Sequence, residues 1–145
     1  MREGLTSTLA LALFLGGGLL AGGARGDQAT YEVKKTDAKA TVGVKGTTSV
    51  TIAARPGWHV NEEAPLTMKL TPEPGITVDK PKLTRADLAQ QTKELARFEV
   101  AFTPSEPGKK TINAEASFVM CQATTCMPVK EKLALAVDVA APRKK

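Results

Sequence analysis

Hydrophobic residues alternate with polar or small residues along much of the chain. The pattern has a period of two in residues 48–52, 66–70 and 98–102, and it becomes longer and more regular toward the C-terminus. Successive side chains of a β-strand point to opposite faces, so this alternation predicts strands that are buried on one side only. The inward positions predicted for the last two strands are Ile112, Ala114, Ala116, Phe118 and Met120, then Leu133, Leu135, Val137 and Val139.

Turn signals separate these segments in regular order. They are Arg55-Pro56-Gly57, residues 72–75 (PEPG) and residues 104–108 (PSEPG). Proline presets φ at an early turn position, and glycine supplies the positive φ that follows. Short strands punctuated in this way predict an all-β fold, an antiparallel β-sandwich of immunoglobulin-like shape.

Residues 83–95 depart from the strand pattern. Thr84 is placed to cap a helix with Asp87 three residues later, and Leu83 could pack on Leu88 as a hydrophobic staple. We therefore expect one short helix or an ordered loop to cross the sandwich here.

The N-terminus reads as an export signal. Arg2 precedes an apolar run over residues 9–20 and the small residues 21–24, which predicts a signal peptide at 1–24 that is cleaved near Ala24. The run is shorter than the roughly 20 apolar residues that span a bilayer. Glu3 weakens the positive n-region, so an uncleaved anchor remains the alternative. We expect a periplasmic or secreted protein without stable membrane insertion after cleavage.

Cleavage would leave about 120 residues, enough for one core and one domain. The expected domain covers residues 27–140, followed by a basic tail at 141–145. The net charge of +5 is spread as lysine and carboxylate mixtures, without a basic stripe interleaved with aromatic residues. Nucleic-acid binding is therefore not expected. One histidine and scattered acids form no hydrolase constellation either.

Cys121 and Cys126 are the only cysteines. If the strand ending at Met120 pairs with the strand starting near Val129, the cysteines close a hairpin. Directly opposed residues then have Cα atoms about 4.5 to 5.5 Å apart, a distance that a disulfide accepts. Since Phe118 and Met120 point inward, the phase places Cys121 on the other face or the rim, where we expect it to be reachable.

Two interpretations of this pair stay open from spacing alone. In one, the disulfide is structural and the protein is a β-sandwich binding module; a bridge across so small a loop contributes only about 2 kcal/mol in the chain-entropy model, so a purely structural bridge would be poorly placed here. A close thiol pair with access to solvent is also the minimum that thiol exchange requires.

Several motifs together resemble a known family. They are Pro56-Gly57-Trp58-His59-Val60-Asn61, Ala64-Pro65-Leu66, Ala96-Arg97-Phe98-Glu99-Val100, and residues 118–128 with both cysteines and Pro128. In this order, over residues 48–139, the chain resembles the N-terminal periplasmic domain of DsbD-type thiol:disulfide interchange proteins.

The resemblance implies an immunoglobulin-like domain of the protein-disulfide reductase type, without a cofactor. It would take electrons from a thioredoxin-like protein and pass them to periplasmic disulfide isomerases or similar acceptors. Cys121 and Cys126 would be the catalytic pair, with Cys126 forming mixed disulfides and Cys121 resolving them. Family members also have a cap loop over the cysteines; its counterpart here would be residues 82–93, with Asp87 and Leu88 as candidates and no aromatic residue.

The loop between the cysteines has four residues, whereas some family members have five. Full family proteins continue into a membrane-spanning electron conduit and a thioredoxin-like domain. A chain ending at Lys145 is expected either to receive its electrons from another protein or not to act as a reductant.

A copper site is a further alternative to the redox interpretation. Cys121, Cys126, Met120 and Met127 form a soft sulfur set suited to Cu(I), to which His59 could add a nitrogen. Such methionines also fill cores beside functional sites. Two cysteines and one histidine fall short of a structural zinc site. We interpret His59 as a structural strand residue and Trp58 as core or the wall of a cleft.

Overall fold

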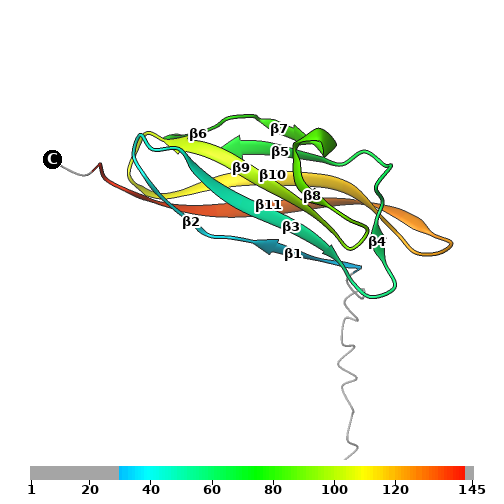
Figure 1. Ribbon diagram of the computed structural model, residues 1–145. Coiled ribbons are helices and arrows are strands. Elements are labelled where there is room, and N and C mark those ends of the chain that lie inside the picture. The colour runs from blue at the N-terminus through cyan, green and yellow to red at the C-terminus, as the bar shows by residue number, and fades with distance from the viewer. Residues whose placement is uncertain (1–29, 143–145) are drawn as a thin grey trace, which may run out of the picture.

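Two β-sheets packed face to face make up the protein in the computed structural model, which describes residues 30–142 (Figure 1). The predicted all-β, immunoglobulin-like sandwich is confirmed. The predicted signal peptide at 1–24 and the last three basic residues lie outside the described residues. Among residues 30–142 there is no helix of the length and apolarity that a membrane crossing needs.

The first sheet has five strands, all antiparallel. Its order is β1 (Tyr31–Lys35), β3 (Gly46–Ala54), β9 (Leu95–Pro104) and β6 (Ile76–Val78), and β8 (Leu88–Gln91) also pairs with β9. β8 uses the first part of β9 and β6 uses its end. One long strand therefore supports two short ones along the same edge.

The second sheet has six strands and is built around the longest hairpin. Its order is β2 (Ala38–Thr41), β11 (Cys126–Ala140), β10 (Gly108–Cys121), β5 (Thr67–Pro72) and β7 (Lys82–Thr84), and β4 (His59–Val60) also pairs with β10. β2 runs parallel to β11, and the other pairs are antiparallel. The parallel pair was not predicted, because alternation of side chains is the same for both strand directions.

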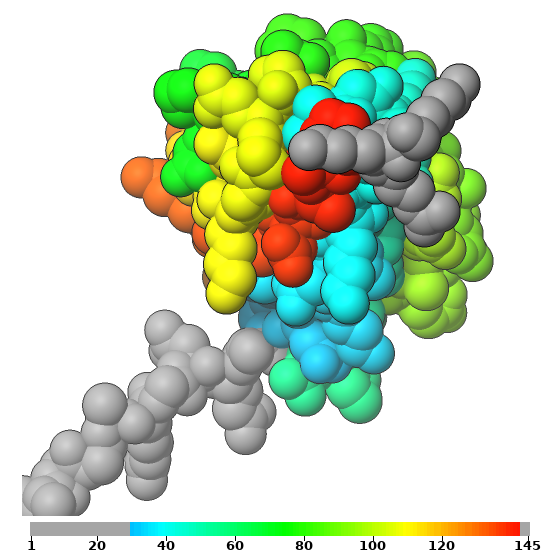
Figure 2. Space-filling model, turned by 90° about the vertical axis from the view of Figure 1, so that its left-hand side faces the viewer, coloured from blue at the N-terminus to red at the C-terminus, as the bar shows by residue number. Residues whose placement is uncertain are grey.

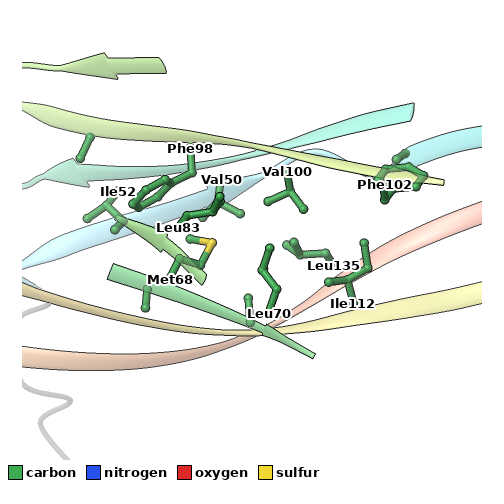
Figure 3. Close-up of a cluster of buried hydrophobic side chains, with 14 of the residues drawn as sticks. Val50, Ile52, Met68, Leu70, Leu83, Phe98, Val100, Phe102, Ile112 and Leu135 are labelled. Atoms are coloured by element: carbon green, nitrogen blue, oxygen red, sulfur yellow. The ribbon is translucent and has the colours of Figure 1, made fainter. Parts of the chain in front are cut away.

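The core lies between the sheets and is made by the residues that alternation assigned to it (Figure 3). In β10 the inward residues from Ile112 to Met120 are all buried. Of the four inward residues predicted for β11, three are buried and Leu133 is half-buried. Full burial of one large aliphatic side chain contributes about 1.5 to 3 kcal/mol. Further buried members are Val50, Ile52, Leu66, Met68, Leu70, Phe98, Val100 and Phe102.

The predicted turns are present at their positions. Gly57, Gly75 and Gly108 have φ of 84°, 94° and 116°, in the region that favours glycine. Figure 2 looks at the end of the sandwich where the β9–β10 turn, the loop after β2 and the end of β11 meet. The β10–β11 hairpin tip lies at the opposite end (Figure 1).

Residues 83–95 form less helix than the capping signal suggested. A single 3₁₀ turn, η1 (Arg85–Asp87), follows β7, and its Asp87 Oδ2 accepts a hydrogen bond from the Thr84 backbone N–H at 2.9 Å. The helix stops after this turn because the next residues pair with β9 as β8. Leu88 packs against the core from this strand. The cap was predicted; the sheet edge that ends the helix was not.

Candidate functional site: the disulfide at the hairpin tip

A disulfide joins Cys121 to Cys126 at the tip of the β10–β11 hairpin. The two residues are the last opposed pair of the ladder, with Cα atoms 4.0 Å apart. Beyond them, the Gln122 N–H donates to the Thr125 carbonyl at 2.7 Å and closes the loop. In Figure 1 this tip extends past the other strands at one end of the sandwich. The predicted hairpin and the proximity of its cysteines are confirmed.

The two cysteines differ in exposure. Cys121 is buried, with 2 % of its surface exposed, whereas Cys126 is exposed. The expectation that Cys121 is reachable was therefore wrong. The sheet face to which Cys121 points was predicted correctly, because its neighbour Met120 points into the core on the opposite face. Cys121 is enclosed, however, because β4 pairs with β10 at this residue and the Asn61 side chain, in the loop after β4, contacts its sulfur.

That cover begins with a short strand pair. His59 lies opposite Cys121 and Val60 opposite Met120, so β4 lines the side of β10 away from β11. The Asn61 backbone N–H then donates to the Val119 carbonyl at 2.9 Å. His59 is thus a strand residue, as predicted, and it also lies on the same sheet face as Cys121.

Asn61 connects this loop to the disulfide. Its Nδ2 donates to Cys121 Sγ at 3.4 Å, while its Oδ1 accepts from the backbone N–H groups of Glu63 at 2.8 Å and Ala64 at 3.0 Å. The same side chain therefore folds the turn and contacts the buried sulfur. Arg85 of η1 steadies the turn by donating to the carbonyls of Asn61 and Ala64.

Sequence reasoning gave Asn61 and Arg85 no role. The only signal for Asn61 is local: asparagine followed by a polar stretch and Pro65 is typical of a side-chain-stabilised turn. Its contact with a cysteine 60 residues away depends on the β4–β10 pairing, which two strand residues are too short to reveal.

A depression of about 380 Å³ opens beside the disulfide. Its charged walls are Glu62, Glu63 and Lys93, and both cysteines and His59 also line it. Lys93 reaches this position because its carbonyl accepts the Val60 N–H at 2.8 Å. The exposed residue of the disulfide, Cys126, thus borders a polar depression whose walls carry both acidic and basic side chains.

The residues expected to form a cap lie elsewhere. Asp87 and Leu88 do not line the depression; Leu88 packs on the core, and Asp87 holds Lys80 in a 2.6 Å ion pair. The hydrogen bond from Lys80 and the backbone bond from Thr84 lower the pKa of Asp87. Of the segment 82–93, only its last residue, Lys93, borders the depression beside the disulfide.

The soft sulfur set is divided between two faces of the sheet. Cys121, Cys126 and His59 share one face, and Met120 and Met127, which are paired across the strands, share the other. Met120 is fully buried, whereas Met127 is 39 % exposed. Within residues 30–142, no three histidine, cysteine or carboxylate side chains cluster as metal ligands.

On that second face, Tyr31 braces the hairpin from β1. Its ring packs edge-on against Phe118 with centroids 5.0 Å apart, and its hydroxyl donates to Glu131. Burial, followed by the hydrogen bond to Glu131, raises the pKa of Tyr31 to about 12. Tyr31 therefore holds the hairpin close to its tip, at Phe118 and Glu131.

Comparisons with known proteins identify no family for this chain. No family model matches the chain, and no curated protein matches it. Similar solved structures include the fimbrial major subunit AggA of Escherichia coli (10 % identity, 76 % of this chain and 94 % of that chain, TM-score 0.41). A second is WR4, an MSP family member of C. elegans (11 % identity, 77 % of this chain and 99 % of that chain, TM-score 0.41). A third is a PapD-like domain of human CEP192 (11 % identity, 99 % of this chain and 100 % of that chain, TM-score 0.38). Such distant similarity carries no argument about activity.

Proposed function

We propose that this protein is a thiol–disulfide exchange module that carries two electrons at a time between a thioredoxin-like dithiol donor and a disulfide-containing acceptor protein. The observation that carries the proposal is the unequal exposure of the two bridged cysteines at a projecting tip. One sulfur is open to a partner, and the other is held beside it under a hydrogen-bonded cover. This is the arrangement that a two-step exchange needs.

In the loading half of the cycle, a donor thiolate attacks Cys126 Sγ. The Cys121–Cys126 bond breaks, a donor–Cys126 disulfide forms, and Cys121 leaves as a thiolate that takes a proton from solvent. The donor's second thiol, losing its own proton to solvent, then attacks the donor sulfur of that bond and releases Cys126 as a thiolate, which takes a second proton from solvent. The donor's first thiol had already lost its proton to solvent when it became the attacking thiolate. The donor has become a disulfide, and this protein has become a dithiol, so two electrons and two protons are transferred.

In the delivery half, Cys126 as thiolate attacks the acceptor disulfide and expels one acceptor thiolate. Cys121 then loses its proton to solvent, attacks Cys126 Sγ, re-forms the internal bridge and expels the second acceptor thiolate; both acceptor thiolates take protons from solvent. The exposed residue therefore contacts partners, and the covered residue completes each turnover. These are the roles that the resemblance assigns to Cys126 and Cys121.

Asn61 supports the proposal chemically. A hydrogen bond to an ionised sulfur is stronger than one to a neutral sulfur, so the Asn61 amide, 3.4 Å from Cys121 Sγ, favours Cys121 as a leaving thiolate. A better leaving group accelerates attack on the bridge. A disulfide that only stabilised the fold would gain nothing from this donor.

The proposal extends to family and compartment. The ordered motifs from Pro56 to Pro128 support a place among DsbD-type N-terminal domains, with periplasmic isomerases or similar proteins as acceptors. The leader-like N-terminus supports export.

The test is a pair of single substitutions. In Cys121→Ser, Cys126 can attack a partner but nothing resolves the product, so mixed disulfides with a thioredoxin-like protein should accumulate. In Cys126→Ser, the remaining thiol is covered and mixed disulfides should be absent. Equal trapping by both variants would contradict the assignment of roles, and trapping by neither would contradict the exchange function.

A structural bridge is the second candidate, favoured by the burial of Cys121. Reduction potential separates the two, since structural bridges are usually below about −300 mV and exchange-active ones are higher. Equilibration with glutathione buffers of graded potential measures it. A disulfide that resists reduction until the protein unfolds would be a structural one.

A further inference from the structure

One edge of β11 is left open beside Cys126. Within residues 30–142, β11 pairs with β10 along its whole length on one side. On its other side it pairs only with β2, and only over residues 137–140. The segment from Cys126 to Lys132 therefore has a free edge that starts at the exposed cysteine.

The ladder pattern tells which backbone groups point to that edge. In an antiparallel ladder, hydrogen-bonded and non-hydrogen-bonded pairs of opposed residues alternate. Gln122 and Thr125 are a hydrogen-bonded pair, so the next pair, Cys121 and Cys126, is not hydrogen-bonded, and the alternation continues along β10 and β11. The N–H and C=O groups of Cys126, Lys130 and Lys132 thus point away from β10. Pro128 occupies the same phase, where its missing N–H removes no bond to β10.

Two contacts agree with this phase. The Val119 carbonyl, opposite Pro128, points away from β11 and accepts the Asn61 N–H. The Ala134 carbonyl points away from β10 and accepts the Lys35 ammonium at 2.7 Å. The unpaired groups between Cys126 and Lys132 are consequently available to another extended chain.

The side chains along this edge are basic. Lys130 and Lys132 are exposed and lie on the same face as Cys126, and the Lys35 ammonium lies at the end of the open segment. Glu131, the acidic residue between them, points to the other face and is bound by Tyr31. The Lys130–Glu115 ion pair is 4.0 Å long and exposed, so it neutralises little.

Building on the proposed exchange function, we infer that this edge docks an extended acidic segment of the redox partner, which adds to β11 as a strand and presents its cysteine to Cys126. A second copy of the same edge is disfavoured, because antiparallel self-pairing would bring Lys130 and Lys132 against lysines. An acidic strand gains both the backbone bonds and the opposite charge.

The added strand would place a cysteine correctly. Because the polar groups of Cys126 point to the open edge, a residue directly opposite it forms a hydrogen-bonded pair, with Cα atoms about 5.5 Å apart. That is within the range for a disulfide, and the side chains of opposed residues share a face. The same edge that binds the partner thus aligns the two sulfurs for exchange.

The experiment uses synthetic peptides of alternating acidic and β-branched residues with one cysteine at the end that meets Cys126. Their rate of mixed-disulfide formation is measured by mass spectrometry. The matched controls are a lysine version and an acidic version that is N-methylated at the residues facing β11. A small neutral dithiol, which needs no edge, reports the basal exchange rate.

The acidic peptide should react at least about tenfold faster than the lysine peptide at low salt, since electrostatic steering raises association rates by at least this factor. N-methylation should abolish the advantage, and Lys130→Glu with Lys132→Glu should reverse it while leaving reduction by the small dithiol unchanged. Equal rates for all three peptides, with normal dithiol exchange, would overturn the docking edge and leave the proposed function standing.

A cysteine-to-serine acidic peptide separates the two proposals further. It should shift the backbone amide NMR signals of Lys130 and Lys132 and leave those of β5 unmoved. Such shifts in a protein that no dithiol reduces would support the docking edge and contradict exchange. The absence of shifts at millimolar peptide would contradict the docking edge whatever the thiol chemistry.

Discussion

Asn61→Asp is the substitution that tests the buried side of the disulfide most directly. The aspartate keeps an oxygen where Asn61 Oδ1 accepts from Glu63 and Ala64, so the turn can form. It replaces the amide that donates to Cys121 Sγ with a carboxylate oxygen. The local fold is preserved while the electrostatic environment of the sulfur is inverted.

The effect is large enough to measure. Loss of the donor disfavours the Cys121 thiolate by about 1 kcal/mol, the difference between hydrogen bonds to charged and to neutral groups. Repulsion between two unit charges 3.4 Å apart adds about 1.2 kcal/mol even at the dielectric constant of water. Together these shift the thiolate titration of Cys121 upward by about 1.5 pH units, at 1.36 kcal/mol per unit.

The predicted kinetic result is slower attack on Cys126. A leaving thiol with a higher pKa leaves more slowly, and if this dependence equals that on the attacking thiol, with a coefficient of about 0.4 to 0.5, a shift of this size slows reduction by about fivefold. The assays are the ultraviolet absorbance of the thiolate against pH and the rate of reduction by a small dithiol. Thr124→Asp, which adds a charge to the exposed loop without removing the donor, is the matched control.

The refuting result is specific. Unchanged titration and unchanged reduction rate in Asn61→Asp, with a melting temperature like that of the parent, would mean that the Asn61 contact does not act on the sulfur. A fall in melting temperature with an unchanged rate would assign Asn61 to the turn alone. Either outcome would remove the argument that the Asn61 amide stabilises the Cys121 thiolate, which distinguishes this disulfide from a purely structural one.

Two further predictions concern groups with shifted pKa values. Tyr31, with its pKa raised to about 12, holds its proton more tightly in the folded state, so folding stability should fall as pH rises from the unfolded value of 10 toward 12. Tyr31→Phe should remove that part of the dependence in urea unfolding, and parallel curves for the two proteins would contradict it. The lowered pKa of Asp87 gives stability that is present above the ordinary aspartate value of 3.8 and lost as pH falls below it. Asp87→Asn should flatten acid unfolding in this window and leave thiol exchange unaltered; a changed exchange rate would show that this residue does act as part of a cap.

The sequence was most informative where local periodicity decides burial. The inward residues of β10 and β11 could be assigned from alternation alone, because a strand with one face in the core must alternate. The cysteine hairpin followed from the same alternation and from two cysteines a few residues apart. The turns followed from proline and glycine, whose backbone preferences are intrinsic.

Contacts between distant segments could not be predicted in this way. Cys121 is buried because β4 and Asn61 reach it from 60 residues upstream, and nothing around residue 121 encodes that cover. The helix expected after Thr84 ended at one turn because β9 offered β8 a sheet edge. The parallel placement of β2 beside β11 likewise depends on the assembled sheet.

The position of the disulfide at the end of the ladder has a consequence for how such a sequence can vary. The four residues between the cysteines lie outside both strands. A residue gained or lost there therefore does not change the sheet face to which each side chain of β11 points. One residue inserted between Cys126 and Lys130 would instead move the lysines to the face of Tyr31 and bring inward residues to solvent. Natural homologues should therefore differ in length at the tip and keep the interval from Cys126 to the inward residues of β11 constant.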